Sequence, residues 1–445
     1  MSRIADIPEI KGLDGRRHLV RIPDQQDVPL TKRARHLIDT AEFRRLAKIS
    51  QLGLVALVYP GAAHTRFEHS LGVYRLALLY LKRLAYDRRF TEIISRHDAE
   101  RFIVAALLHD LGHWPFCHPI EDIELAAVPN HELLANSFLL ESEIAEILRD
   151  EWGITAREVV ALLSEKPSAT NTRLSASMLS GPIDVDKMDY LVRDSLHAGV
   201  PYGRNFDQQR LIGSLCVNHA GDGLAITDKG RTAAEMMVFA RYVMFSEVYW
   251  HHAVRSATAM LQRVFSLLYR KLDLDVVFRL EEGLLIDRLR RAAADGPALE
   301  LLDGLFGSTR QLYKRCAQFS VFQYPDQHRQ LARRPYRWLV ECARHFAAVL
   351  SEHWKTTVLP HEVLFDAPPV KLEVQFDIEI HFPKQRRYCR LEDVSPVVKT
   401  LARTQFDDYV KQVRIFLHPR LATDARRLRN VTSLVDEAIR RTEAS

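Results

Sequence analysis

Apolar residues recur at intervals of three and four positions along most of the chain after residue 30. The spacing is clear at 37–49 and at 71–81, and it continues through 102–108, 132–149, 156–163 and the long segment 231–272, which lacks glycine and proline. This spacing places apolar side chains on one face of an α-helix. The pattern therefore predicts a mainly α-helical core.

Three stretches depart from the helical pattern and predict strands. Near the N-terminus, the run HLVRI lies between turn residues and predicts a small strand-and-turn arm. Residues 215–218 and 224–227 flank Ala-Gly-Asp-Gly, which is typical of a β-hairpin. Apolar and polar residues alternate over 370–382, and 411–419 repeats this strand signal.

These patterns divide the chain into four parts. We expect an N-terminal arm at 1–28, a helical core at 29–272, a helical extension at 273–355 and a C-terminal α+β lobe at 356–445. The predicted fold class is mainly α, with a helical core, a small β-hairpin and the C-terminal lobe.

Composition excludes several classes of protein. The chain has 445 residues, 47% of them apolar, and a net charge of only +5, which does not fit intrinsic disorder. Its apolar runs are much shorter than the roughly 20 residues that span a membrane, and its N-terminus does not resemble a secretory signal. We therefore expect no membrane association and a cytoplasmic location. The five cysteines are widely spaced, without a CxxC pair, and we interpret them as reduced thiols.

Histidines are concentrated in one region: seven of the 19 lie within residues 64–131. His109 and Asp110 end an apolar helical run, so an imidazole and a carboxylate emerge together where the helix stops. Together with His69 and Asp186 they form a set of nitrogen and oxygen donors suited to one divalent metal ion. This ligand set leaves Mn, Fe, Mg, Zn, Ni and Co open.

Three motifs resemble one known family. HTRFEHSLGV at 64–73, ALLHDLGHWPFCH at 106–118 and DVDKMDYLVRDSLHAGV at 184–200 occur in the order found in HD-domain phosphohydrolases. They are most similar to the deoxynucleoside triphosphate (dNTP) triphosphohydrolases of the SAM-and-HD-domain type and to bacterial dGTPase-like enzymes. The resemblance covers about residues 30–265 and identifies 29–272 as an HD phosphohydrolase core.

The resemblance assigns roles to residues of this sequence. Its metal ligands agree with those inferred from the chemistry: His69, His109, Asp110 and Asp186. It implies catalytic roles for His113, His118, His131 and Glu121, with His118 as the proton donor to the leaving oxygen. It implies substrate contacts from Gln51, Leu52, Arg66, Lys187, Tyr190, Asp194, Arg241 and Tyr249, in which Arg66, Lys187 and Arg241 bind phosphate.

Some positions depart from the family pattern. Trp114 stands where relatives usually have a small residue, which suggests either a narrower pocket or a base stacked on the indole. Glu121 replaces an aspartate that orients the catalytic histidine. The allosteric nucleotide site of some relatives is not carried over, because Arg44 and Ala47 accompany Asp39 in place of the expected partners.

The resulting hypothesis is a metal-dependent dNTP triphosphohydrolase that releases a deoxynucleoside and inorganic triphosphate. An alternative keeps the metal site but acts as a phosphodiesterase, nucleotidase or exonuclease on nucleic-acid ends or another nucleotide. A third reading is a nucleotide-binding regulatory module without catalysis. The resemblance also implies a homo-oligomer, and it leaves open a nucleotide activator and single-stranded nucleic acid as partners.

Overall fold

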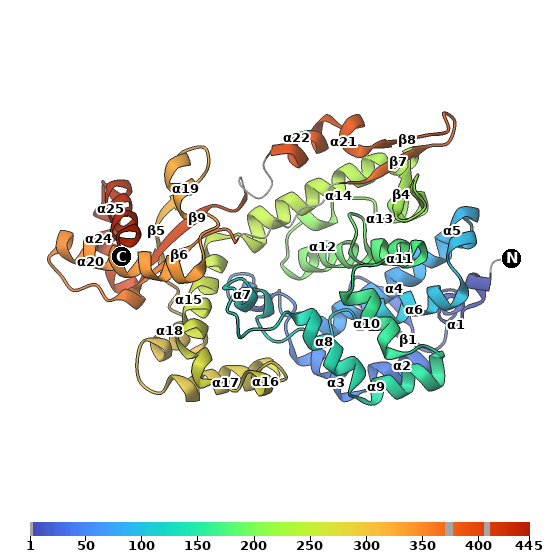
Figure 1. The fold of residues 1–445 in the computed structure, drawn as a ribbon, viewed down its shortest axis with the longest axis horizontal. Helices are drawn as coiled ribbons and strands as arrows, with labels where there is room; N and C mark the ends of the chain where they lie inside the picture. The colour runs from blue at the N-terminus through green and yellow to red at the C-terminus, as the bar shows by residue number, and fades with distance from the viewer. Residues whose placement is uncertain (1–2, 370–376, 405–409) are drawn as a thin grey trace. The chain divides into compact units, whose positions relative to one another are not determined.

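The chain folds into two compact units, each built from three separate segments (Figure 1). The computed structural model describes residues 3–369, 377–404 and 410–445. The first unit comprises Met1–Trp114, Asn130–Met244 and Gln375–Thr404, and the second comprises Pro115–Pro129, Phe245–Val374 and Gln405–Ser445. The four-part division expected from the sequence stays a prediction.

The first unit is mainly helical, as predicted. Its helices are α1 (Pro8–Gly12), α2 (Lys32–Ile38), α3 (Ala41–Arg45), α4 (Arg66–Leu84), α5 (Arg88–Ile93), α6 (Arg96–Leu108), α8 (His131–Leu140), α9 (Glu143–Ile147), α10 (Ala156–Ser164), α11 (Thr170–Ser180), α12 (Val185–His197), α13 (Gln208–Ser214), α14 (Arg231–Met244), α21 (Leu391–Val394) and α22 (Pro396–Thr404). Its strands are β1 (Leu19–Ile22), β2 (Gln26–Pro29), β3 (Leu215–Val217), β4 (Leu224–Thr227), β7 (Glu379–Phe382) and β8 (Arg387–Arg390).

Helices α4, α6 and α12 form the centre of the first unit. α4 begins where the Thr65 hydroxyl accepts a hydrogen bond from the backbone N–H of Glu68, and α6 begins with a capping box of Ser95 and Asp98. α4 packs against both α6 and α12, and the apolar faces of these helices are almost completely buried. This packing holds the start of α4, the end of α6 and the start of α12 in fixed positions.

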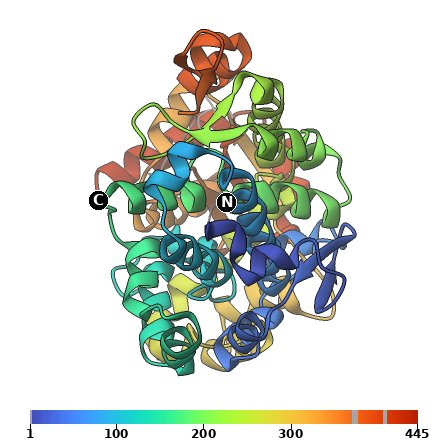
Figure 2. The same cartoon turned by 90° about the vertical axis from the view of Figure 1, so that its right-hand side faces the viewer.

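Two small sheets belong to the first unit. In the predicted strand-and-turn arm, β1 and β2 form a hairpin, blue in Figure 2, which lies beside α4. The predicted hairpin of β3 and β4 is confirmed, and β7 extends it by pairing parallel to β4, with Ala225 opposite Glu379. β8 then pairs antiparallel to β7. Of the strand predicted at 370–382, residues 370–376 lie outside the described residues.

The second unit combines helices with a three-stranded sheet in the order β5-β9-β6. Its helices are α7 (Cys117–Glu121), α15 (His252–Leu268), α16 (Leu274–Val277), α17 (Glu282–Ala293), α18 (Pro297–Phe306), α19 (Pro325–Leu331), α20 (Tyr336–Trp354), α24 (Ala422–Arg427) and α25 (Val431–Glu443). Its strands are β5 (Lys314–Phe319), β6 (Val363–Asp366) and β9 (Val413–Leu417).

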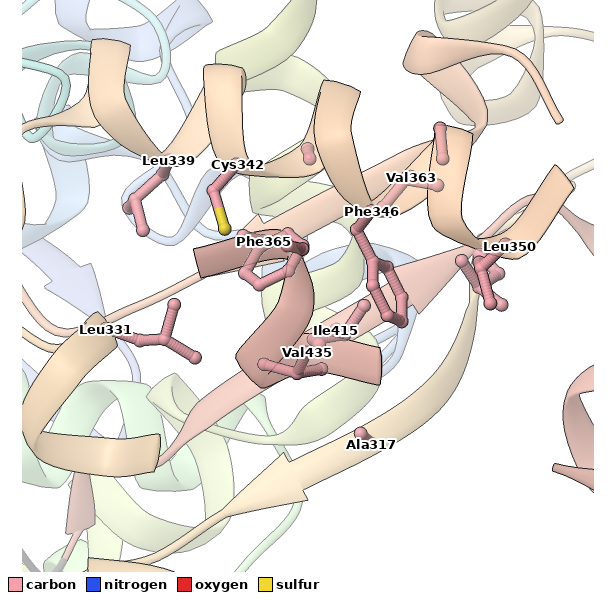
Figure 3. Close-up of a cluster of buried hydrophobic side chains, with 14 of the residues drawn as sticks. Ala317, Leu331, Leu339, Cys342, Phe346, Leu350, Val363, Phe365, Ile415 and Val435 are labelled. Carbon is pink, nitrogen blue, oxygen red and sulfur yellow. The ribbon is translucent and has the colours of Figure 1, made fainter. Parts of the chain in front are cut away.

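A buried apolar cluster joins this sheet to α20 and α25. Phe346 of α20, Phe365 of β6, Ile415 of β9 and Val435 of α25 point toward one another (Figure 3). β9 confirms the strand predicted at 411–419. The helical prediction for 273–355 was wrong at β5. These residues form a strand because they pair with β9, which lies about 100 residues later in the chain.

Two further expectations can be compared with the fold. Within the described ranges, the longest helices are too polar to serve as membrane spans. The five cysteines are free thiols, as predicted, and three of them are buried.

Candidate active site

Three helix ends bring the four predicted metal ligands together in the first unit. His69 lies one turn into α4, and His109 and Asp110 follow the last residue of α6. Asp186 lies in the first turn of α12, whose N-cap residue is Asp184. The ligands therefore come from segments that are distant in sequence but held together by the packing of these helices.

The donor atoms of His69, His109 and Asp186 converge, and Asp110 lies beside the two imidazoles. His69 Nε2 lies 3.0 Å from Asp186 Oδ1 and 3.3 Å from His109 Nε2. His109 Nε2 lies 3.4 Å from Asp110 Oδ1 and 3.8 Å from Asp186 Oδ1. Ligand atoms at about 2.0–2.2 Å from a common ion are about 3 Å apart, so the separations among His69, His109 and Asp186 fit one shared ion.

The orientation of both imidazoles also fits a metal. His69 Nδ1 lies 2.8 Å from Asp189 Oδ2, and His109 Nδ1 lies 3.0 Å from the carbonyl oxygen of Ala106. In each ring Nδ1–H therefore donates a hydrogen bond to an oxygen acceptor, and Nε2 is the nitrogen that faces the other ligands. Metal-binding histidines typically have such an acceptor behind them.

Asp110 is a buried carboxylate surrounded by basic groups. Arg66 Nη1 donates to its Oδ2 at 2.8 Å, and His113 Nδ1 lies 3.2 Å from its Oδ1. Burial would raise the pKa of Asp110, but His113, Arg66 and the neighbouring imidazoles hold it well below its usual range. Asp110 is thus ionised, as a metal ligand must be.

His69 lies between two carboxylates and is almost completely buried. Burial opposes its protonation, but hydrogen bonds to Asp186 and Asp189 raise its pKa to about 10. A divalent cation would satisfy the same carboxylates, and it would replace the proton on Nε2.

His113 and His131, two predicted catalytic residues, lie side by side in the first unit. Their ring centroids are 4.1 Å apart, and His113 is buried. His131 is the first residue of α8, which approaches closely because residue 112 is glycine. A Cβ at Gly112 would lie 2.1 Å from the carbonyl oxygen of His131 and 2.6 Å from the backbone nitrogen of Ala135.

The predicted phosphate-binding residues of the first unit differ in their surroundings. Lys187 is held by Asp184: its Nζ lies 2.5 Å from Asp184 Oδ2. Arg66 bonds Asp110 through Nη1, while its buried Nε has no hydrogen-bond partner among the described residues. Arg241, on α14, is buried. Burial raises the pKa of Tyr190, and the positive charge of Arg241 partly offsets this rise.

The predicted nucleoside contacts of the first unit are held by neighbouring residues. Asp194 is buried and lies 2.9 Å from His64 Nε2. Gln51 donates its backbone N–H to the carbonyl oxygen of His64, and its side-chain oxygen is buried with no partner within the described part of the chain. Leu52 follows it and is half-buried.

Three predicted site residues belong to the second unit. His118 and Glu121 are both on α7, with His118 Nδ1 3.6 Å from Glu121 Oε2. Tyr249 ends a π-helical turn that begins at Phe245. Trp114, the last residue of the first segment, is fully buried, which does not fit a base stacked on an open indole face.

The sequence reasoning missed several residues behind the ligands. Asp189 contacts His69 and accepts a hydrogen bond from Arg193. Asp184 accepts a hydrogen bond from Lys187. Their spacing carried a signal, because Asp189 and Arg193 are four positions apart on α12, as expected of a helical ion pair. That spacing alone does not show which neighbour such a pair supports.

Comparison with known proteins places these features in a family context. A family model described as HD domain matches residues 66–194, and one described as HD associated region matches 206–419. An uncharacterized protein of Methanocaldococcus jannaschii is 31% identical over 308 residues, 68% of this chain and 60% of that protein. The deoxynucleoside triphosphate triphosphohydrolase SAMHD1 of Gallus gallus is 31% identical over 260 residues, 52% of this chain and 42% of that protein.

A solved structure extends the likeness to most of the chain. A hypothetical protein of Aquifex aeolicus superposes with a TM-score of 0.70 at 26% identity, covering 92% of this chain and 98% of that one. By contrast, the alignments with the two curated relatives span only about two fifths to three fifths of those proteins.

Proposed function

We propose, from the premise that this chain is an HD-domain phosphohydrolase, that it hydrolyses dNTPs to deoxynucleosides and inorganic triphosphate. The observation that carries the proposal is the convergence of His69, His109 and Asp186 in the first unit, with Asp110 beside them and bound by Arg66. The sequence similarity to SAMHD1, whose name states this reaction, supports dNTPs as the substrate class.

The proposed metal ligands are His69, His109, Asp110 and Asp186. The divalent ion they would hold supplies Lewis-acid polarisation of a phosphoryl oxygen and activation of a water molecule. Mixed imidazole and carboxylate ligands suit Mn, Fe, Mg, Zn, Ni and Co, so the proposal does not name the metal.

The chain's own cations would neutralise the triphosphate. Arg66 is well placed, because its buried Nε has no partner among the described residues and can donate to a phosphate oxygen. Lys187 would exchange its bond to Asp184 for one to phosphate, and Arg241 would add a buried positive charge beside Tyr190. These charges offset the negative charge that grows on the leaving group.

The sugar would be recognised by polar groups of the same unit. Asp194 and the buried Gln51 oxygen are the groups we propose for the 3′-hydroxyl, and Tyr190 for the sugar edge. A site that hydrogen-bonds a required hydroxyl rejects substrates that lack it, because its buried polar groups are then left without partners. The proton donor, His118 with Glu121, stays a prediction from the family resemblance.

The decisive experiment separates the products of metal-reconstituted protein by ion-exchange chromatography. Each of the four dNTPs and GTP is tested singly and in mixtures, which also reveals an activating nucleotide. We expect deoxynucleoside and triphosphate from the wild type, none from the His109→Ala, Asp110→Ala double variant, and normal turnover from His36→Ala, a half-buried histidine on α2 that pairs with Glu151. If every nucleotide survives while single-stranded DNA, RNA or cyclic nucleotides are cleaved, the alternative phosphohydrolase reading replaces this one.

A further inference from the structure

Asp189 lies behind the candidate metal centre and contacts one of its ligands. Its Oδ2 is 2.8 Å from His69 Nδ1, the nitrogen that faces away from Asp186 and His109. Asp189 itself is 3% exposed, so neither water nor a bound nucleotide can replace it as the acceptor. The contact determines which ring nitrogen of His69 carries the proton and how the ring is turned.

An arginine fixes the position of that carboxylate. Arg193 Nε and Nη2 donate to the two oxygens of Asp189, both at 2.8 Å, and Arg193 Nη1 donates to Glu68 at 2.7 Å. His197 Nε2 lies 2.8 Å from the same Glu68 oxygen. Arg193 is 2% exposed, so this is a bidentate, desolvated ion pair with little freedom to move.

The helix opposite makes room for the pair through a glycine. A Cβ at Gly72 of α4 would lie 2.0 Å from Asp189 Oδ1 and 2.3 Å from Arg193 Nη2. Gly72 follows His69 by three positions, so it lies on the same face of α4. The backbone of α4 therefore leaves a space that the ion pair fills.

The same network continues toward a proposed nucleoside contact. The His197 ring stacks on His64 at 4.3 Å between centroids, and His64 Nε2 lies 2.9 Å from Asp194 Oδ1. Both ends of the network thus meet residues to which the proposed function gives a role.

We propose that Asp189 is a positioning residue for metal binding: held by Arg193 in the space beside Gly72, it fixes the His69 imidazole with Nε2 toward the ion. The proposal rests on the metal site of the proposed function. A carboxylate that only stabilised the fold would leave metal affinity unchanged when removed, whereas a positioning residue changes affinity and ligand geometry.

The test titrates metal-free protein with Co²⁺, whose visible absorption reports both affinity and ligand geometry. The first variant is Asp189→Asn, which removes the charge that His69 and Arg193 share. Its matched control is Asp366→Asn in the second unit, since Asp366 is equally buried and accepts from Arg255 Nε and Nη2 at 2.6–3.1 Å. Thermal melts show how far each variant loses stability.

A second variant displaces Asp189 without changing any charge. Gly72→Ala places a methyl group where the ion pair lies, and Gly213→Ala is the control because a Cβ there meets nothing within 4 Å. This pair keeps the test decisive if Asp189→Asn does not fold. Circular dichroism establishes which variants are folded before titration.

We expect Asp189→Asn and Gly72→Ala each to weaken Co²⁺ binding by about 10- to 100-fold and to alter the absorption bands. The two controls should bind within about twofold of the wild type. Unchanged Co²⁺ affinity and spectrum in the folded variants would overturn the positioning role.

The same titration separates this proposal from the proposed reaction. If Asp189→Asn weakens Co²⁺ binding but the wild type hydrolyses no dNTP, the positioning role stands and the substrate proposal fails. If the His69→Ala variant binds Co²⁺ as tightly as the wild type, the metal site is elsewhere and both proposals fail.

Discussion

The ammonium group of Lys187 lies 2.5 Å from Oδ2 of Asp184, a carboxylate with no exposed surface. Asp184 also caps α12, because its Oδ1 accepts the backbone N–H of Lys187 at 2.6 Å. The residue proposed to bind phosphate is therefore already bound to a carboxyl group of its own chain, whose pKa burial raises to about 7 although Lys187 opposes the rise. A triphosphate must compete with that carboxylate for the ammonium group.

Asp184→Asn should consequently tighten substrate binding. Asparagine can still cap α12, but it no longer neutralises Lys187, so we expect the KM for dNTPs to fall by about 3- to 10-fold, equivalent to about 1 kcal/mol. Lys187→Met should raise KM. Steady-state kinetics at saturating metal measure both, and a KM that rises in Asp184→Asn would show instead that Asp184 orients Lys187 for phosphate.

Loss of a proposed metal ligand should have a larger effect than loss of an outer residue. His109→Ala removes one Nε2 donor. Removing a residue behind a ligand typically weakens metal binding by about 10- to 100-fold, so we expect a larger loss of metal affinity here. Turnover should fall with it. Equilibrium dialysis with metal analysis measures the bound ion. Stoichiometric metal and normal turnover in a folded His109→Ala protein would remove His109 from the proposed ligands.

The close approach of α8 to residue 112 predicts a strong effect of a small substitution. Gly112→Ala adds a methyl group that overlaps the backbone of His131 and Ala135, so the start of α8 must shift. We expect a loss of about 1–3 kcal/mol in unfolding free energy, measured by urea denaturation. The control Gly283→Ala on α17, where a Cβ meets nothing within 4 Å, should be neutral or slightly stabilising.

One surface pair predicts a pH dependence of stability. Burial opposes ionisation of Glu158, but hydrogen bonds from His97 and Thr155 outweigh it and lower the pKa of Glu158 from 4.5 to about 2. A lowered pKa in the folded state stabilises the fold above pH 4.5, and this contribution disappears as the pH falls toward 2.

Glu158→Gln should therefore lower the unfolding free energy at pH 7 by about 1 kcal/mol, a value reduced because a third of the side chain is exposed. The difference from the wild type should shrink between pH 5 and pH 2. Urea denaturation at pH 7, 4 and 3 measures it, with Glu92→Gln, in an exposed pair with Arg88, as the control. A difference that does not vary with pH would show that the effect comes from capping geometry rather than charge.

Helical periodicity predicted the helices whose apolar positions form one buried face. The hairpin of β3 and β4 was predictable because a short turn joins its strands. β5 was not, because its strand conformation depends on β9, which follows it by about 100 residues. No local pattern encodes such a partner.

For the site, the motifs predicted four metal ligands, and the structure brings the donor atoms of three of them, His69, His109 and Asp186, close together at helix ends. It did not predict that Lys187 would be held by Asp184, nor that Asp189 would meet His69 through the space beside Gly72. Those contacts depend on how two helices face each other, which residue types alone do not determine.

The parallel pairing of β4 with β7 has a consequence for the synthesis of this protein. Residue 379, which pairs with Ala225, leaves the ribosome roughly 150 residues later. At about 5–20 residues per second, the nascent chain carries β4 without that neighbour for roughly 10–30 s. An open strand edge is a template for wrong pairing, so the growing chain is exposed to aggregation during this interval and can gain from a chaperone.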